Sequence, residues 1–316
     1  MSDAPLSRSP EAKGARLDPL FEGVCLAAAS LVLLTLAGVV VSLAIGGWPA
    51  FQKFGLGFLT SHEWNPVTNV YGAAGPIIGT LATAAIALLF ALPTAFGVAI
   101  FLVELCPNVL RRPIAVAVEL LAGIPSVVYG MWGLFVFAPL FAKYVQMPAM
   151  LAAPTGSIWE KLFFGVPNGA NILSASIILA LMILPFMAAM LRELLLTVPK
   201  EVRESAYGMG STTLEVVSKV TLPYVRKGAV GAVMLGLGRA LGETMAVTFI
   251  IGNAHGLPAS LFASGSTIAS TIANEFTEAV DPMHTSALVA LGLVLFVVTF
   301  VVFGVARVLV GRKVHA

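Results

Sequence analysis

The chain has 316 residues, of which 58% are hydrophobic and 11% charged, and its mean hydropathy is +0.95. Soluble proteins carry about 25% charged residues, so this composition excludes a soluble domain and indicates a polytopic membrane protein. The net charge of +2 leaves no basic field to bind nucleic acid, and the two cysteines, Cys25 and Cys106, are too few for a disulfide framework or a four-ligand zinc site.

Six apolar runs, nearly free of charge, are long enough to cross the ~30 Å bilayer core as helices that rise ~1.5 Å per residue. The first run is longer than the ~7 to 15 apolar residues of a secretory signal, so we expect an uncleaved first helix. The sequence therefore predicts an all-α polytopic fold with a transmembrane domain at 21–310 and short tails at 1–20 and 311–316. The six predicted spans are 21–46, 76–103, 114–141, 172–191, 229–252 and 285–310.

The lysines and arginines indicate the orientation of these spans, because cytoplasmic loops retain such residues. With the N-terminus inside, the outer side holds only Lys53, Lys143 and Lys161, while Arg239 lies within the fifth predicted span. Both tails are therefore expected in the cytoplasm, as an even number of spans requires. The fourteen basic residues assigned to the inner side are Arg8, Lys13, Arg16, Arg111, Arg112, Arg192, Lys200, Arg203, Lys219, Arg226, Lys227, Arg307, Arg312 and Lys313.

The loops between the predicted spans differ in length and in charge. The inner loop 192–228 is long and charged. The outer segments 47–75, 142–171 and 253–284 are rich in Gly, Pro, Ser and Asn and hold no run of charge. The last of them has no Lys or Arg, and we expect its stretch 266–276 to form a short helix at the outer interface.

The sequence lacks the common catalytic and nucleotide-binding patterns. His62 begins an H-E-x-x-H pattern, but Pro66 stands where the second histidine is needed, and the four histidines show no ligand spacing. There is no G-x-S-x-G and no Gly-Lys dipeptide, so a P-loop is absent. We therefore predict no catalytic residue, no metal site and no cofactor, and any ATP must be bound by another chain.

The inner loop carries the most specific pattern in the sequence. It resembles the EAA motif of ABC importer membrane subunits, which is E-A-A, three residues, G, nine residues, a hydrophobic residue, one residue and L-P. The spacing fits throughout, and Ser205 in place of alanine is the only departure. An ordinary solvated loop with Gly and Pro as breaks is the alternative. The matching residues are Glu204, Ser205, Ala206, Gly210, Val220, Leu222 and Pro223.

The residues of this loop suit a rigid element that docks to an ATPase subunit. The stretch 201–209 can form a short amphipathic helix, and Gly210 permits a turn that a β-carbon would hinder. Pro223 stops or starts a helix before the fifth span. We therefore predict that the segment from Glu204 to Pro223 couples the membrane domain to an ATPase.

Two further stretches narrow the resemblance. Residues 119–139 read ELLAGIPSVVYGMWGLFVFAP and residues 238–253 read GRALGETMAVTFIIGN; both are similar to the PstC-type membrane subunit of bacterial phosphate ABC importers. The resemblance covers nearly the whole chain from the first span to the last. It implies a type I importer permease in the bacterial inner membrane that moves inorganic phosphate and is not itself an enzyme.

The resemblance also implies partners. A related PstA-type permease subunit would pair with this chain within the membrane lipid, two ATPase subunits would dock below, and a periplasmic phosphate-binding protein would deliver substrate from above. We expect the binding protein to contact the outer segment 253–284 and the loop after the first span, whose small polar residues suit a surface that docks and releases.

Arg239 and Glu243 are the candidate residues of the substrate path. Both lie within the fifth predicted span, where each charge costs ~2.5 to 3.5 kcal/mol at the helix centre. Four residues apart on one helix face, they are expected to pair. The planar guanidinium matches phosphate oxygens, and Glu243 would hold it or exchange with the substrate. The alternative is a structural ion pair that only fixes helix register.

Glu119 is a second charged residue within a predicted span, and it either marks the inner interface or belongs to a functional region. Six residues later, Pro125 ends the sequence Gly-Ile-Pro, which breaks the helical hydrogen-bond ladder. Broken helices at membrane depth are tolerated where they line a cavity. The sequence leaves cavity lining and a plain helix kink as open alternatives.

Three other functions fit the same residues less well. An ion-coupled secondary transporter would use Arg239 and Glu243 without an ATPase, which would leave the EAA-like loop idle. A membrane scaffold would gain little from charges at mid-membrane. A permease for sulfate or molybdate is the third alternative. Only the resemblance favours phosphate over these substrates, because residue chemistry alone does not separate the oxyanions.

Overall fold

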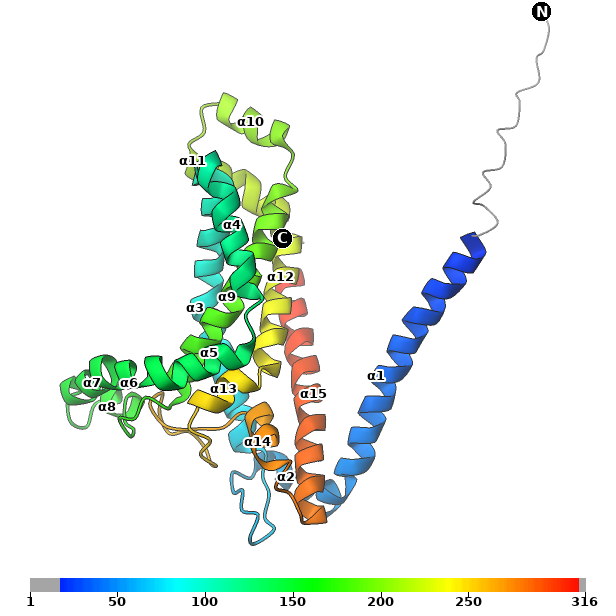
Figure 1. Ribbon diagram of the computed structural model, residues 1–316, viewed down its shortest axis with the longest axis vertical. Coiled ribbons are helices and arrows are strands. Elements are labelled where there is room, and N and C mark those ends of the chain that lie inside the picture. Colours follow the sequence, from blue (N-terminus) through cyan, green and yellow to red (C-terminus); the bar gives the residue numbers. More distant parts are fainter. Residues whose placement is uncertain (1–17, 313–316) are drawn as a thin grey trace, which may run out of the picture.

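The computed structural model describes residues 18–312, and helices make up most of them (Figure 1). Most of the predicted tails, at 1–17 and 313–316, lie outside the described residues, so the tail boundaries stay predictions. In chain order the α-helices and π-helical turns (η) are α1 (Asp18–Phe54), α2 (Gly57–Thr60), α3 (Ala74–Ile100), η1 (Phe101–Leu105), α4 (Asn108–Ala122), α5 (Ser126–Trp132), η2 (Gly133–Phe137), α6 (Ala138–Phe141), η3 (Ala142–Gln146), α7 (Met147–Ala152), α8 (Ile158–Leu162), α9 (Ile172–Leu196), α10 (Lys200–Gly208), α11 (Thr213–Glu215), η4 (Val216–Thr221), α12 (Leu222–Gly242), α13 (Met245–Ile250), α14 (Ile268–Glu275) and α15 (Pro282–Arg312).

Helix α9 is the centre of the bundle, where it packs against α3, α4, α12 and α13. Its closest partner is α3, whose contact face is a stripe of alanines spaced three or four residues apart, which is one face of a helix. Small side chains let two membrane helices approach closely and gain contact along their whole length. The buried alanines are Ala84, Ala87, Ala91, Ala95 and Ala99.

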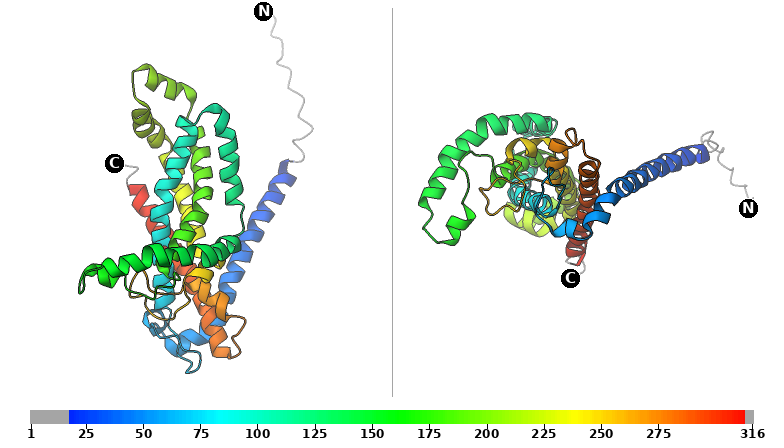
Figure 2. Two further views of the ribbon diagram at one scale, coloured as in Figure 1. Left: turned by 60° about the vertical axis from the view of Figure 1, so that its left-hand side comes forward. Right: turned by 90° about the horizontal axis from the view of Figure 1, so that it is seen from below.

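The predicted count of six spans is not confirmed. Five helical segments are long and apolar enough to cross a membrane, and they begin at Asp18, Ala74, Ser126, Ile172 and Pro282. The predicted third span, 114–141, is divided between α4 and α5, because Pro125 has extended backbone (ψ 139°) and supplies no N–H to continue the ladder. The chain then leaves the bundle sideways, and the segment 126–152 projects as an arm (Figure 2).

The predicted fifth span, 229–252, is also interrupted. Helix α12 starts earlier than predicted, at Leu222, and ends at Gly242. Glu243 follows with extended backbone (ψ 127°), and the short helix α13 continues from Met245. The spanning element is therefore two helices joined at a break, and residues on the two sides of that break do not share a helix face.

Helices α1 and α15 pack together only near their outer ends. The hydroxyl of Ser286 donates to the carbonyl of Gly46 at 2.8 Å and accepts from the N–H of Ala50 at 3.2 Å. Toward its N-terminal end α1 diverges from the bundle, and no residue of its most apolar window is buried in the described chain (Figures 1 and 2). This part of α1 therefore offers its apolar surface to the membrane or to another subunit.

The arm is fastened at its far end by a buried glutamine. The side-chain amide of Gln146 donates to the carbonyl of Val166 at 2.7 Å and accepts from the N–H of Gly169 at 3.0 Å. The segment that follows α8 is thereby tied to the arm. Because a buried amide left unpaired is unfavourable, this pairing fixes where the chain returns to α9.

The two ends of the bundle are clearly different. Helix α10 lies at one end, together with the first residues of α1 and the last residues of α15, whereas α2 and α14 lie at the opposite end (Figure 1). The first and last described residues are thus on the side of α10. We call the α10 side the coupling end and the opposite side the outer end.

Candidate functional site

The EAA-like segment folds as its sequence predicts. Residues 200–208 form α10, and its C-terminus closes with Gly210 at a φ of 85°, which a residue with a β-carbon rarely adopts. The N–H of Gly210 donates to the carbonyl of Tyr207 at 2.9 Å, and that of Ser211 donates to the carbonyl of Ala206 at 3.2 Å. These two bonds form a Schellman motif, which satisfies the last carbonyls of the helix and sets the direction of the chain.

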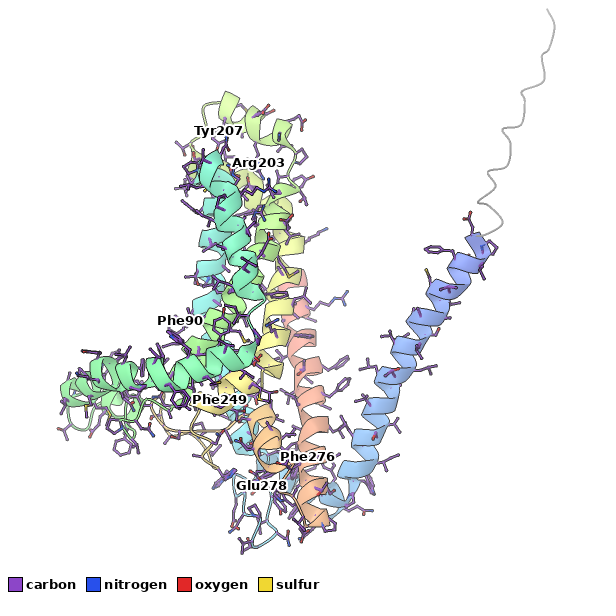
Figure 3. The ribbon with its side chains drawn as sticks, viewed as in Figure 1. Phe90, Arg203, Tyr207, Phe249, Phe276 and Glu278 are labelled. Atoms are coloured by element: carbon purple, nitrogen blue, oxygen red, sulfur yellow. The ribbon has the colours of Figure 1, made fainter. Side chains whose placement is uncertain are left out.

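The two faces of α10 have different surroundings. Ala206 is buried, and the side chain of Arg203 is directed to the bundle (Figure 3). Glu204 and Ser205 are exposed, and the hydroxyl of Ser205 donates to the carbonyl of Glu201 at 2.6 Å. The glutamate of the motif is therefore free to meet another protein, while the opposite face of the helix holds it to this one.

The second half of the segment is ordered by local bonds. The hydroxyl of Thr212 accepts from the N–H of Glu215, whose carboxylate in turn accepts from the N–H of Thr212, so the pair forms a capping box. Lys219 lies 2.9 Å from Glu215, and its hydrogen bond, with those of Thr212, lowers the pKa of Glu215 to about 2. Pro223 is the second residue of α12, which continues directly from the π-helical turn η4, and Leu222 is half-buried beside it.

A buried ion pair joins this segment to the bundle. Arg203 Nη1 lies 3.1 Å from Glu104 Oε1, on the π-helical turn η1 at the end of α3. The sequence does not predict this pair, because the two residues are ninety-nine positions apart and nothing local links them. The only local signal is that Arg203 and Ala206 are three residues apart and so share the inner face of α10.

The predicted pairing of Arg239 with Glu243 is wrong. Glu243 lies beyond the end of α12, and its carboxylate accepts from the N–H of Ala246 at 3.3 Å. No carboxylate oxygen of the described residues lies within 4.0 Å of the Arg239 guanidinium. The guanidinium instead lies over the ring of Phe186, 5.6 Å from its centroid, and its buried Nε has no hydrogen-bond partner among the described residues.

A half-open groove of about 720 Å³ runs from Phe186 toward the coupling end. One face of α9 forms most of its wall, and Ala122 of α4 lies directly before the Gly-Ile-Pro break. Glu119 also lines it, so this residue belongs to the groove and does not simply mark an interface. The complete lining is Glu119, Ala122, Phe186, Ala189, Met190, Glu193, Leu194 and Thr197.

The coupling end of this groove carries more negative than positive charge. Arg192 Nη1 lies 3.0 Å from carboxylate oxygens of both Glu119 and Glu193. Both carboxylates are more than half exposed, so this shared pairing contributes little to stability. Its effect is to give the coupling end of the groove one cation between two anions.

The outer end is held together by one carboxylate. Glu275, the last residue of α14, accepts from the indole N–H of Trp64 at 2.8 Å and lies 2.8 Å from His284 Nε2 and 3.3 Å from His255 Nε2. The ring of Tyr71 stacks on His284, and burial raises the pKa of this phenol. Among residues 18–312, no group of three or more His, Cys, Asp or Glu residues is arranged to hold a metal ion.

The short helix expected at 266–276 exists as α14, but it does not lie on the surface as we expected. Its first turn, from Ile268 to Thr271, is buried. The N–H of Ile268 donates to the hydroxyl of Thr80 on α3 at 2.9 Å, and a β-carbon on Gly79 would lie only 2.0 Å from the carbonyl of Ser266. Exposed residues are Ala273 on the second half of the helix and, just after it, Phe276, Thr277 and Glu278 (Figure 3).

The sequence matches a known family of membrane proteins. The model of the family described as "binding-protein-dependent transport system inner membrane component" matches residues 95–315. A protein of Mesorhizobium japonicum named phosphate transport system permease protein PstC is 55% identical over 93% of this chain and 90% of its own length. A protein of the same name from Pasteurella multocida is 52% identical over 90% of this chain and 88% of its own length.

The fold is shared with a solved transporter. The matching structure is a bacterial alginate ABC transporter in complex with a periplasmic protein bound to an alginate pentasaccharide. One of its chains superposes with a TM-score of 0.62 and covers 96% of this chain and 97% of its own length. At 16% identity this is a likeness of fold alone.

Proposed function

The chain belongs to the family of binding-protein-dependent transport system inner membrane components, and from this premise we propose how its residues take part in phosphate import. It is the membrane-spanning permease subunit of an ABC importer for phosphate. It is a transport subunit and not an enzyme, because the ATPase is a separate subunit. It crosses the inner membrane several times.

We infer that three kinds of partner complete the importer. They are a related PstA-type permease subunit, two ATPase subunits at the coupling end and a periplasmic phosphate-binding protein at the outer end. The family description, which names transport that depends on a binding protein, supports this inference. The absence of a P-loop from the sequence supports a separate ATPase.

The coupling end is proposed to face the cytoplasm. The excess of Lys and Arg in the inner loops supports this orientation, as does the position of α10 and of both described chain ends on one side of the bundle (Figure 1). With this orientation the exposed face of α10, which carries Glu204 and Ser205, meets the ATPase. The Schellman turn at Gly210 then holds that face at a fixed angle.

The observation that carries the substrate path is the unpaired guanidinium of Arg239. Phe186 is near the middle of α9, so the cation that lies over its ring is also near mid-height in the bundle. Arg239 is half-buried, and a cation at mid-height in a membrane bundle normally needs an anion beside it. The described chain supplies no carboxylate oxygen within 4.0 Å. We propose that transported phosphate supplies that anion, since guanidinium offers a planar fork of donors.

The groove beside Phe186 provides the rest of the path within this chain. It leads from the level of Arg239 to Thr197 at the coupling end, and it is open on one side. We propose that the second permease subunit closes that side and completes the route to the cytoplasm. The carboxylates of Glu119 and Glu193 at the coupling end of the groove would repel an anion and so favour its release.

The structure makes Arg239→Leu a clean test of this path. Removing the cation leaves no described carboxylate unpaired within the bundle, so the variant should assemble. ATP-dependent uptake of labelled phosphate into reconstituted vesicles is expected to be lost. Arg239→Lys, which keeps the charge but not the fork, should retain a small part of it. Arg307→Gln, an exposed arginine on α15, is the matched control and should transport normally.

Normal uptake by an assembled Arg239→Leu variant would remove Arg239 from the substrate path. Normal uptake by Arg239→Lys together with loss in Arg239→Leu would mean that charge alone matters and that the fork geometry does not.

A further inference from the structure

Arg203 connects three helices at the coupling end. Its Nη1 lies 3.1 Å from Glu104 Oε1, and its Nη2 donates to the carbonyl of Leu195. The two charged side chains are largely withdrawn from solvent, with 15% of Arg203 and 7% of Glu104 exposed. Burial keeps salt and water from screening the pair, unlike an ion pair on the surface.

The partners of Arg203 are the ends of the central helix pair. Glu104 belongs to η1, which extends α3, and Leu195 lies in the last turn of α9, where unpaired carbonyls give the helix a partial negative charge that attracts a cation. One guanidinium therefore binds α10 to the ends of both α3 and α9. These two helices are packed along the alanine stripe, so a displacement of their ends is transmitted along their length.

The pair is not locked by ideal hydrogen bonds. Arg203 Nε and Glu104 Oε1 are both buried and have no aligned hydrogen-bond partner among the described residues. The contact is therefore held mainly by charge, and a small rotation of α10 can change its geometry without breaking it. A π-helical turn such as η1 is itself a common site of adjustment in membrane and soluble helices.

We propose that Arg203 and Glu104 form the joint through which movement of α10 reaches the α3–α9 pair. The proposal rests on the proposed docking of α10 to the ATPase. Arg203 and Glu104 are positioning residues in this scheme, since neither touches phosphate or ATP. The exposed face of α10 receives the movement, and the buried face passes it to the helices that position the substrate groove.

The test uses the complete importer in vesicles, with four variants. Glu104→Gln and Arg203→Gln each remove one charge. Arg203→Lys keeps the ion pair but cannot reach Glu104 and the Leu195 carbonyl together. The double variant Glu104→Arg with Arg203→Glu exchanges the two charges. Arg307→Gln is the matched control, because it removes an exposed charge on α15, outside the coupling segment. The measurements are the yield of assembled complex, ATP hydrolysis with and without phosphate-loaded binding protein, and phosphate uptake.

If Arg203 and Glu104 form this joint, their variants should lose coupling between ATP hydrolysis and phosphate uptake. In Glu104→Gln and Arg203→Gln, ATP hydrolysis without binding protein should stay near that of the wild type. The ratio of phosphate taken up to ATP hydrolysed should fall about tenfold, which is within the usual range of coupling between sites. Arg203→Lys should assemble in full and show a smaller fall in the same ratio. The charge exchange should recover part of the ratio, and Arg307→Gln should leave it unchanged.

An unchanged ratio in the assembled Arg203→Lys variant would overturn the proposal, whether or not the neutral variants assemble. A lower yield of complex with a normal ratio of uptake to hydrolysis would show a purely structural pair and would also overturn it. Absence of ATP-dependent phosphate uptake by the wild-type complex would instead count against the proposed function, so the two failures are distinguishable.

Discussion

Replacing Gly210 tests whether the turn after α10 sets the coupling geometry. The residue has a φ of 85°, and a β-carbon built on it would meet nothing within 4 Å. The effect of Gly210→Val is therefore backbone strain alone, about 1–2 kcal/mol for a residue forced into the left-handed region, and a β-branched residue is among the least suited to it. No buried apolar contact is lost, so the subunit should insert and fold.

The strain can be relieved by opening the Schellman motif, which changes the angle of α10. A preference of about 1–2 kcal/mol corresponds to a 5–30-fold smaller population of the native turn. We expect phosphate uptake by the assembled importer to fall by a factor in this range, measured in vesicles at limiting ATPase subunit. Gly210→Asn is the control, because asparagine tolerates the left-handed region, and it should lose much less. Wild-type uptake by Gly210→Val at an equal yield of complex would refute the reasoning.

Three further predictions concern the outer end and the groove. Thr277→Cys, on the exposed tip after α14, should crosslink to the phosphate-binding protein, and crosslinks found only from the coupling end would contradict the orientation. Glu275→Gln removes the charge that binds Trp64, His255 and His284, so it should lower the free energy of unfolding by about 1.5–3 kcal/mol. An unchanged midpoint of thermal unfolding would contradict the role of Glu275 in holding the outer end together. Glu119→Gln leaves Arg192 paired with Glu193 and should change stability by less than about 1 kcal/mol in a denaturation assay; a larger loss would show that Glu119 is a structural anchor.

The sequence predicted the features that depend on neighbouring residues. The helix over 201–209 and the turn at Gly210 follow from local spacing and backbone preference, and the structure contains both. The helix boundary expected at Pro223 is absent, because α12 continues directly from η4. The break at Pro125 was also visible locally, although the direction of the arm after it was not. A bend angle depends on what the following helix packs against, and that information is spread over the whole chain.

The sequence failed where the outcome depends on residues far apart. The pairing of Arg239 with Glu243 assumed an unbroken helix, but α12 ends at Gly242, where packing of α13 against α9 and α5 outweighs helix continuity. The joint between Arg203 and Glu104 and the hub at Glu275 connect segments that no spacing rule relates. Tertiary packing determines all three of these arrangements, and the periodicity of the sequence does not indicate tertiary packing.

The central claim is that this chain is the phosphate permease of an ATP-driven importer. The most direct measurement is uptake of labelled phosphate into vesicles that contain the purified complex, with ATP supplied to the ATPase side and the loaded binding protein on the other side. We expect phosphate uptake to require this chain, ATP and the binding protein. Excess sulfate or molybdate should not reduce this uptake. Uptake driven by an ion gradient without ATP, or competition by those oxyanions at equal concentration, would contradict the central claim.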